Sequence, residues 1–257
     1  MPGNIQFLTG QLRTPPMPTD DLTGRTILVT GANSGLGLDA AKLLIKLNCS
    51  TIVIACRDVS KGKATEDLLR AFSSQNGKKS TIIPFELEMT SFASVVSFTT
   101  RCKDLPRLDA VILNAGIAEV EFKLAEGYEK TITVNVISTF LLATLLLPIL
   151  RASARKYSIT PNIAIVGSAV HFWTDPKQLT KPASGQILKA VSDRQSADMK
   201  GRYFLSKLPV MLLVKYLGSV LEKSAQQDSS GKPLVVLNNV APGFCVSSKS
   251  PPQINRN

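Results

Sequence analysis

The sequence predicts a doubly wound α/β fold, in which helices cover both faces of a parallel β-sheet. Apolar runs of strand length recur along the chain, and longer segments with helical spacing separate them. The runs are continuous rather than alternating, as strands buried on both faces require. Such alternation of strands and helices produces a parallel sheet between two helical layers. The expected strands are residues 26–30, 51–55, 81–85, 110–113, 163–166 and 234–240, and the expected helices are residues 35–47, 60–73, 91–103, 126–151 and 203–223.

Length and composition fit one domain. The 257 residues are 44% hydrophobic and 19% charged, which is enough apolar content for one sizeable core. We expect the domain to cover residues 22–247, between a proline-containing leader over residues 1–21 and a short polar tail over residues 248–257. The leader has no long apolar run, so neither a signal peptide nor a membrane span is expected, and the expected location is cytoplasmic.

Charge, cysteine and histidine content argue against several classes of protein. Lys and Arg number 30 against 19 Asp and Glu, a net charge of +11 that suits phosphate-bearing partners. These charges are scattered and lack the aromatic interleaving of a single-strand binder, so no nucleic-acid partner is expected. The four cysteines show no paired C-x-x-C spacing, and His171 is the only histidine, so we expect no metal site.

A glycine-rich turn follows the first expected strand and opens the first expected helix. It reads TGANSGLG over residues 30–37. Glycines let backbone amides approach a pyrophosphate, and a helix N-terminus adds partial positive charge. Glycines also make ordinary tight turns, but this position between strand and helix is typical of a Rossmann-type dinucleotide site. The expected cofactor contacts in this turn are Gly31, Asn33, Ser34, Gly35, Leu36 and Gly37.

The end of the second expected strand favours NADP(H) over NAD(H) as the cofactor. A carboxylate at this point would accept both ribose hydroxyl hydrogen bonds, but the sequence has Ala55, Cys56 and Arg57. The Arg57 guanidinium matches a 2′-phosphate in charge and geometry. Asp58 is either the cap of the next helix or a ribose ligand, and Lys61 is either a second phosphate contact or a solvated helix residue.

Tyr203 and Lys207 lie four residues apart in the last expected helix. At this spacing both side chains project from one face, so their polar ends can converge. A phenol with a pKa near ~10 is a poor base at neutral pH, and a nearby ammonium favours the phenolate, so we expect Lys207 to lower the pKa of Tyr203. In isolation such a pair is more typical of an amphipathic surface, but the glycine turn upstream favours an acid/base site.

The motifs, in their order, resemble those of the short-chain dehydrogenase/reductase family. The glycine turn has the spacing G-x-x-x-G-x-G, and Asn-Ala-Gly follows at residues 114–116. Further along come Asn135, Ser168, Tyr203-x-x-x-Lys207 and Pro-Gly at residues 242–243. The resemblance covers about residues 22–247 and is closest to retinol-dehydrogenase-like members, including those of fungal secondary-metabolite pathways.

This resemblance implies roles for individual residues. Tyr203 would be the acid/base, Lys207 would also hold the nicotinamide ribose, and Ser168 would hydrogen-bond the substrate oxygen. Asn135 would support a water relay, and Glu88 takes the place of an aspartate that meets the adenine amino group. Taken singly, Ser168 is typical of a turn and Asn135 of a helix asparagine bonded to nearby backbone. The remaining expected cofactor contacts are Asn114, Ala115, Gly116, Pro242, Gly243 and Val246.

These expectations combine into an oxidoreductase that moves hydride between NADP(H) and a carbonyl or secondary alcohol. An insert at residues 174–199 is expected to shape the pocket for a lipophilic small molecule, such as a polyketide or terpenoid intermediate. One alternative is a protein that binds NADP(H) without turnover and has a regulatory or scaffolding role. A second is a basic protein that binds nucleic acid or a membrane surface.

The C-terminal part of the expected fold is abbreviated. After the Pro-Gly pair the chain continues with FCVSSKSPPQINRN, too few residues for the helical lid, strand and closing helix that the resemblance implies. We expect either an enzyme whose partner subunit covers the site or a shortened product of doubtful activity. An open sheet edge would also favour a homo-oligomer.

Overall fold

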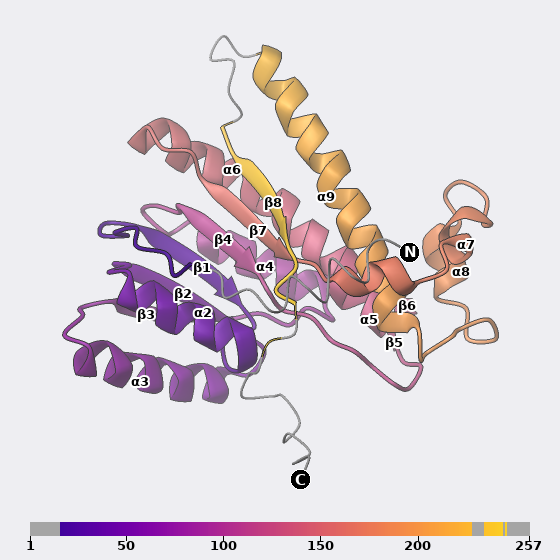
Figure 1. Ribbon diagram of the computed structural model, residues 1–257, viewed down its shortest axis with the longest axis horizontal. Helices are drawn as coiled ribbons and strands as arrows, with labels where there is room; N and C mark the ends of the chain where they lie inside the picture. The colour runs from indigo at the N-terminus through magenta and orange to yellow at the C-terminus, as the bar shows by residue number, and fades with distance from the viewer. Residues whose placement is uncertain (1–15, 228–233, 244, 246–257) are drawn as a thin grey trace.

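A six-stranded parallel sheet runs through the computed structural model, which describes residues 16–227, 234–243 and 245 (Figure 1). Its strands are β1 (Thr26–Thr30), β2 (Thr51–Cys56), β3 (Thr81–Glu86), β4 (Ala110–Leu113), β7 (Asn162–Val166) and β8 (Val236–Val240). Their order in the sheet is β3-β2-β1-β4-β7-β8. The order reverses beside β1, so the sheet is doubly wound, as predicted. Each predicted strand is present, with ends that differ by at most two residues.

Helices cover both faces of this sheet (Figure 1). Neighbouring strand residues point into separate apolar cores: Ile27 and Val29 belong to one, and Leu28 to the other. Because both faces are buried there, the central strands β1 and β2 are mostly apolar, which explains their continuous runs in the sequence. The edge strand β8 differs, since Asn238, Asn239 and Val240 are exposed. The helices on the first core are α2 (Gly35–Lys46) and α3 (Val59–Gln75), and those on the second are α4 (Phe92–Cys102), α6 (Thr139–Tyr157) and α9 (Arg202–Gln227).

The predicted bounds of the helix at residues 126–151 are wrong at both ends. A small hairpin comes first, and its turn residues Glu126 and Gly127 have φ of 53° and 79°. Helical structure begins after Glu129, whose carboxylate accepts hydrogen bonds from the amides of Thr131 and Ile132. The segments are β5 (Leu124–Ala125), β6 (Tyr128–Glu129), α5 (Lys130–Ile132), the π-helical turn η1 (Thr133–Ser138) and then α6.

The chain between β7 and α9 folds into short helices. A 3₁₀-helix, η2 (Ala169–Trp173), follows β7 directly and packs along α9. Two short α-helices, α7 (Lys177–Thr180) and α8 (Ile187–Val191), occupy the insert. Of these two helices, α8 contacts β6.

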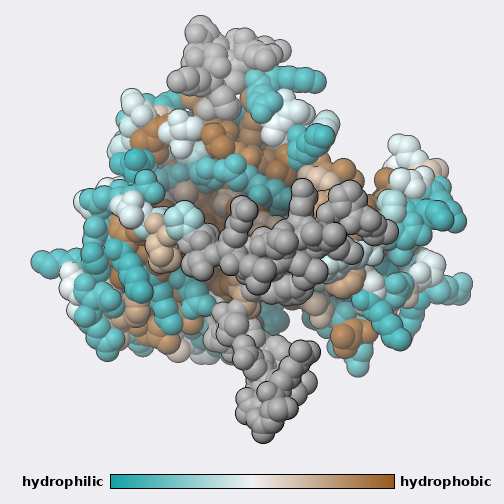
Figure 2. All heavy atoms as spheres, in the orientation of Figure 1, coloured by the Kyte–Doolittle hydropathy of each residue, from teal (hydrophilic) through white to brown (hydrophobic). Residues whose placement is uncertain are grey.

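Two helical runs are long and apolar enough to cross a membrane by length and composition alone, Lys130–Tyr157 and Arg202–Ser224. In the fold, core packing explains the apolar character of the first run, because Leu142, Leu146 and Leu150 are fully buried. The second run keeps apolar side chains such as Tyr216 exposed. Figure 2 shows apolar side chains gathering in the upper part of the view, around β8 and α9. The absence of a membrane span stays a prediction.

Asp109 joins the beginnings of β1 and β4. Its buried carboxylate accepts hydrogen bonds from the Thr26 amide at 2.8 Å, from Arg25 Nη1 at 2.9 Å and from Arg107 Nη2 at 2.6 Å. Burial would raise the pKa of Asp109, but the hydrogen bonds from Arg107, Thr26 and Arg25 more than offset it, so the pKa lies below its ordinary value. The ionised carboxylate therefore stabilises the central strand pair.

We predict that Asp109→Asn lowers the free energy of unfolding by about 2 kcal/mol near neutral pH, because the charge-assisted bonds are lost in a buried place. The folded-state pKa is depressed, so this stabilisation is complete above the unfolded pKa of ~3.9 and is lost as the pH falls through the folded pKa. Urea unfolding of both proteins at neutral and acid pH measures the difference, which should narrow in acid.

Asp67→Asn is the matched control. Asp67 forms a surface pair with Lys63 at 3.7 Å, and its side chain is 65% exposed, so its loss should change little. A stability difference for Asp109→Asn that stays constant across the pH range would contradict the assigned role of its ionised carboxylate.

Candidate functional site

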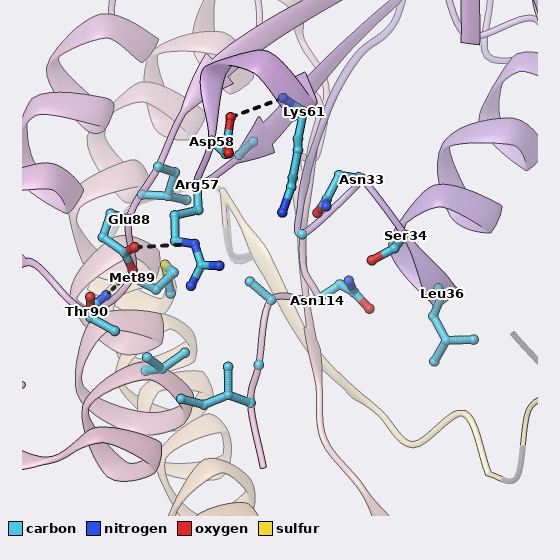
Figure 3. Close-up of a pocket in the computed structure, with 18 of the residues that line it drawn as sticks. Asn33, Ser34, Leu36, Arg57, Asp58, Lys61, Glu88, Met89, Thr90 and Asn114 are labelled. Carbon is cyan, nitrogen blue, oxygen red and sulfur yellow. Dashed lines mark hydrogen bonds and ion pairs between the residues drawn. The ribbon is translucent and has the colours of Figure 1, made fainter. Parts of the chain in front are cut away.

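A cavity of about 470 Å³ opens at the carboxyl ends of the central strands (Figure 3). It lies where the strand order reverses, which is the place where doubly wound sheets bind ligands. Its walls come from the glycine turn, from the ends of β2, β3 and β4, and from the start of the α5 and η1 helical run. The lining residues that the sequence predicted as cofactor contacts are Gly31, Asn33, Ser34, Gly35, Leu36, Arg57, Lys61, Glu88, Asn114, Ala115 and Gly116.

The glycine turn brings α2 close to the end of β1. Gly31 and Gly35 have φ of 66° and 57°, in the left-handed region that favours glycine. A Cβ on Gly37 would collide with the Gly31 carbonyl oxygen, so Gly37 serves the packing of helix against turn. Gly37 does not line the cavity, and its expected contact with the cofactor stays a prediction. Ser34 is the N-cap of α2 and makes no side-chain bond to the helix amides, and the N-terminus of α2 borders the cavity through Ser34, Gly35 and Leu36.

Two cationic side chains reach into the same space from the end of β2 and the start of α3, as Figure 3 shows for Arg57 and Lys61. Arg57 is 68% exposed, and its Nε lies 3.7 Å from a carboxylate oxygen of Glu88. The other oxygen of Glu88 accepts a hydrogen bond from the Thr90 amide at 2.9 Å. Both oxygens of Glu88 thus contact protein groups, and its expected contact with adenine stays a prediction.

Asp58 caps α3. Its carboxylate accepts hydrogen bonds from the amides of Ser60 at 2.8 Å and Lys61 at 3.2 Å. These amides lie at the N-terminus of the helix, where an acidic side chain is also favoured by the helix dipole. Of the two roles the sequence left open, the structure supports the helix cap.

Thr30 ties the two strands that flank the cavity, and the sequence reasoning missed it. Its hydroxyl accepts hydrogen bonds from the amides of Asn114 and Ala115, at 3.0 and 2.9 Å, and its carbonyl accepts one from Asn114 Nδ2. The signal was a polar residue at the end of an apolar strand. Lining residues without any motif were missed too: Ala55, Leu87, Met89, Thr90, Ile117, Glu119, Lys130 and Val134.

Ser168, Tyr203 and Lys207 come together although a long insert separates the first from the others. The Ser168 hydroxyl hydrogen-bonds to the Tyr203 phenol. The Lys207 ammonium lies 5.5 Å from the centre of the Tyr203 ring and donates a hydrogen bond to the Val166 carbonyl at 2.8 Å. The convergence that the four-residue spacing predicted is confirmed.

The expected direction of the Tyr203 pKa is wrong for the protein alone. Burial raises the pKa of Tyr203, and the hydrogen bond with Ser168 offsets only part of this effect. Burial also lowers the pKa of Lys207 to about 8. Desolvation disfavours the charged form of both groups, and it outweighs the attraction between ammonium and phenolate on which the sequence argument relied.

Asn135 lies in the π-helical turn η1 and bonds within the protein. Its Oδ1 accepts a hydrogen bond from the Ile117 amide at 2.9 Å. Its Nδ2 donates to the Ile117 carbonyl at 2.9 Å and to Ser206 Oγ at 3.0 Å. Both donor positions of this side chain are therefore used, and it connects the cavity wall at Ile117 to α9. The expected support of a water relay stays a prediction.

Three predicted cofactor contacts follow β8 in the sequence: Pro242, Gly243 and Val246. Pro242 and Gly243 follow β8 but do not line the cavity, and Val246 lies outside the described residues. The His171 ring stays beside Ser168, with its Nδ1 at 2.6 Å from the Ser168 carbonyl oxygen. Among the described residues, no group of three or more His, Cys, Asp or Glu side chains could hold a metal ion.

Comparison with known proteins agrees with this fold. The family model described as short chain dehydrogenase matches residues 25–174. The short-chain dehydrogenase anuD of Penicillium roqueforti is 39% identical over 95% of this chain and 61% of its own length. The short chain dehydrogenase FGM9 of Gibberella zeae is 38% identical over 93% of this chain and 67% of its own length. The chain thus spans about two thirds of the length of these relatives.

A solved structure shares the fold. The Pseudomonas aeruginosa RhlG/NADP active-site complex superimposes with a TM-score of 0.65 over 90% of this chain and 77% of that one, at 24% identity. The family model covers more than half of the 257 residues, and its span holds the glycine turn, Asn135 and Ser168. This chain therefore belongs to the short-chain dehydrogenase family.

Proposed function

We propose that this chain is an NADP(H)-dependent oxidoreductase that interconverts a carbonyl compound and a secondary alcohol. The observation that carries the proposal is the contact of Ser168 with Tyr203, with Lys207 beside the phenol. The residues of the cavity wall fit a dinucleotide, because a helix N-terminus and two cations border it. The names of the relatives agree with this reaction class.

Three side chains have separate roles in the reduction: Tyr203, Ser168 and Lys207. A bound nicotinamide supplies the hydride. Tyr203 donates a proton to the carbonyl oxygen, and its raised pKa keeps the phenol protonated at neutral pH, which suits the direction of reduction. Ser168 stabilises the negative charge that develops on the same oxygen. Lys207, with a pKa of about 8, keeps a positive charge near the phenol as the proton leaves.

Arg57 and Lys61 supply the preference for NADP(H). Both side chains line the cavity at the end of β2, where a carboxylate would repel a 2′-phosphate. The loose pair of Arg57 with Glu88, at 3.7 Å, leaves the guanidinium able to bind a phosphate oxygen. Charge at this point therefore supports NADP(H) over NAD(H).

The substrate that we propose is a lipophilic carbonyl compound. Phe172 and Trp173 follow Ser168 in η2, and their side chains are 67% and 42% exposed. The Trp173 ring makes an edge-to-face contact with Phe204, the neighbour of Tyr203 in α9. Exposed aromatic surface close to the proton donor suits an apolar molecule better than a sugar or an amino acid.

We predict that Tyr203→Phe reduces kcat by at least about a hundredfold, because the proton donor is lost, while NADPH binding is retained. The assay follows the nicotinamide absorbance with a panel of lipophilic ketones and aldehydes, and the intrinsic fluorescence of NADPH reports binding. Tyr216→Phe is the matched control, since Tyr216 lies in the same helix with a side chain that is 68% exposed. A wild-type protein that binds NADPH and reduces nothing would instead favour a role without turnover.

We predict that Arg57→Ala weakens NADPH binding by about tenfold or more and leaves NADH binding unchanged, because a charge-assisted bond to the 2′-phosphate is lost. Lys63→Ala controls for net charge, since Lys63 lies in the adjoining helix α3, outside the cavity lining, with its side chain 64% exposed. Titration of each variant with both cofactors measures the effect. Equal losses for NADPH and NADH would refute the selective role of Arg57.

A further inference from the structure

A chain of buried hydrogen bonds runs from the cavity wall to the backbone of Tyr203. The Asn135 side chain holds both backbone polar groups of Ile117, each at 2.9 Å, and Ile117 lines the cavity. The Asn135 amide also donates to Ser206 Oγ at 3.0 Å. The Ser206 hydroxyl in turn donates to the Tyr203 carbonyl at 2.7 Å. The Ser206 hydroxyl therefore connects Asn135, which holds the cavity wall at Ile117, to the turn of α9 that carries Tyr203.

The hydrogen bonds between Asn135, Ser206 and Tyr203 lie in the protein interior. Ser206 is completely buried and Asn135 is 3% exposed, so water does not compete for these bonds. The single O–H of Ser206 is used on the Tyr203 carbonyl, which leaves its oxygen free to accept from Asn135. A partner lost from such a network leaves a buried polar group unsatisfied.

A second buried contact holds the other side of the same helical turn. Arg202, which precedes Tyr203, is 1% exposed and lies 3.6 Å from the carboxylate of Glu129, which is fully buried. Glu129 also caps the helical run that leads to Asn135, through the amides of Thr131 and Ile132. The turn that carries Tyr203 is thus tied to the α5 and η1 run on both sides of the tyrosine.

We propose that Ser206 is a positioning residue of the active site, whose hydroxyl transmits the position of the cavity wall through Asn135 to the turn of α9 that carries Tyr203. This inference rests on the proposed function for its kinetic consequence only. Without the hydroxyl, the Tyr203 turn loses its register against Asn135, and the phenol is held less well against Ser168. Ser206 itself touches neither substrate nor cofactor.

The test compares Ser206→Ala with Ser219→Ala. Ser219 Oγ makes the same local bond, to the Tyr216 carbonyl at 2.7 Å, but from a solvent-accessible part of α9. Three readouts are used: kcat, the dissociation constant of NADPH, and the titration of Tyr203 from tyrosinate absorbance. Subtraction of the Tyr203→Phe titration isolates Tyr203 from the other three tyrosines, since the chain has 4 in all.

We expect Ser206→Ala to lower kcat by about tenfold and to leave the NADPH dissociation constant within about twofold of wild type. The Tyr203 titration should shift to higher pH, because a weaker bond from Ser168 stabilises the phenolate less. Ser219→Ala should match wild type in all three readouts. A Ser206→Ala protein whose Tyr203 titration and kcat equal those of wild type would overturn the proposal, whatever its thermal stability.

Two other results of these experiments also bear on the proposal. If Ser206→Ala does not fold, Ser206→Cys keeps the volume with a weaker hydrogen-bonding group, and the same readouts apply: an upward shift of the Tyr203 titration supports the proposal and an unchanged one overturns it. If the wild-type protein reduces no compound, the proposed function fails. The Tyr203 titration needs no substrate, so it still decides the role of Ser206.

Discussion

The attachment of β4 to β1 through Thr30 is the constraint on which the cavity depends. The Thr30 hydroxyl accepts hydrogen bonds from two backbone amides, those of Asn114 and Ala115, and so fixes where the chain leaves β4. The same residue begins the glycine turn, whose close contact with α2 requires Gly37. Because both walls start from Thr30, the glycine-turn side and the Ile117 side of the cavity keep a defined separation. A parallel sheet alone would leave that separation to the loops.

The site near Tyr203 is held by buried polar contacts rather than by apolar packing alone. Asn135, Ser206, Lys207 and the pair of Arg202 with Glu129 are all buried, and each contacts the segment of α9 that carries the tyrosine or belongs to it. Such groups are expensive to bury unless they are paired, but once paired they define one arrangement of the segments they join. Burial also affects the ionisation of this site, because desolvation shifts the pKa of Tyr203 upward and that of Lys207 downward.

Several predictions from the sequence were correct because they depended on local spacing. The strands followed from continuous apolar runs, and the convergence of Tyr203 with Lys207 followed from a four-residue interval on a helix. The helix expected at residues 126–151 failed at its start, because the positive φ of Glu126 and the cap by Glu129 are decided by a turn that periodicity does not encode. The prediction for the Tyr203 pKa failed because it considered the nearby Lys207 ammonium and left out the burial of the phenol.

The sequence by itself determined the order of the elements, the glycine turn and the identity of the charged and hydroxylic residues at the site, since these depend on short-range pattern. Only the tertiary structure decided that Gly37 packs against the turn, that Asp58 is a helix cap and that Asn135 reaches Ser206 across 71 positions of the chain. Contacts of this kind depend on how far helices approach the sheet and on which groups lose their water. The approach of the helices and the loss of water both depend on how the layers pack. Neither can be predicted from the spacing of residues along one segment.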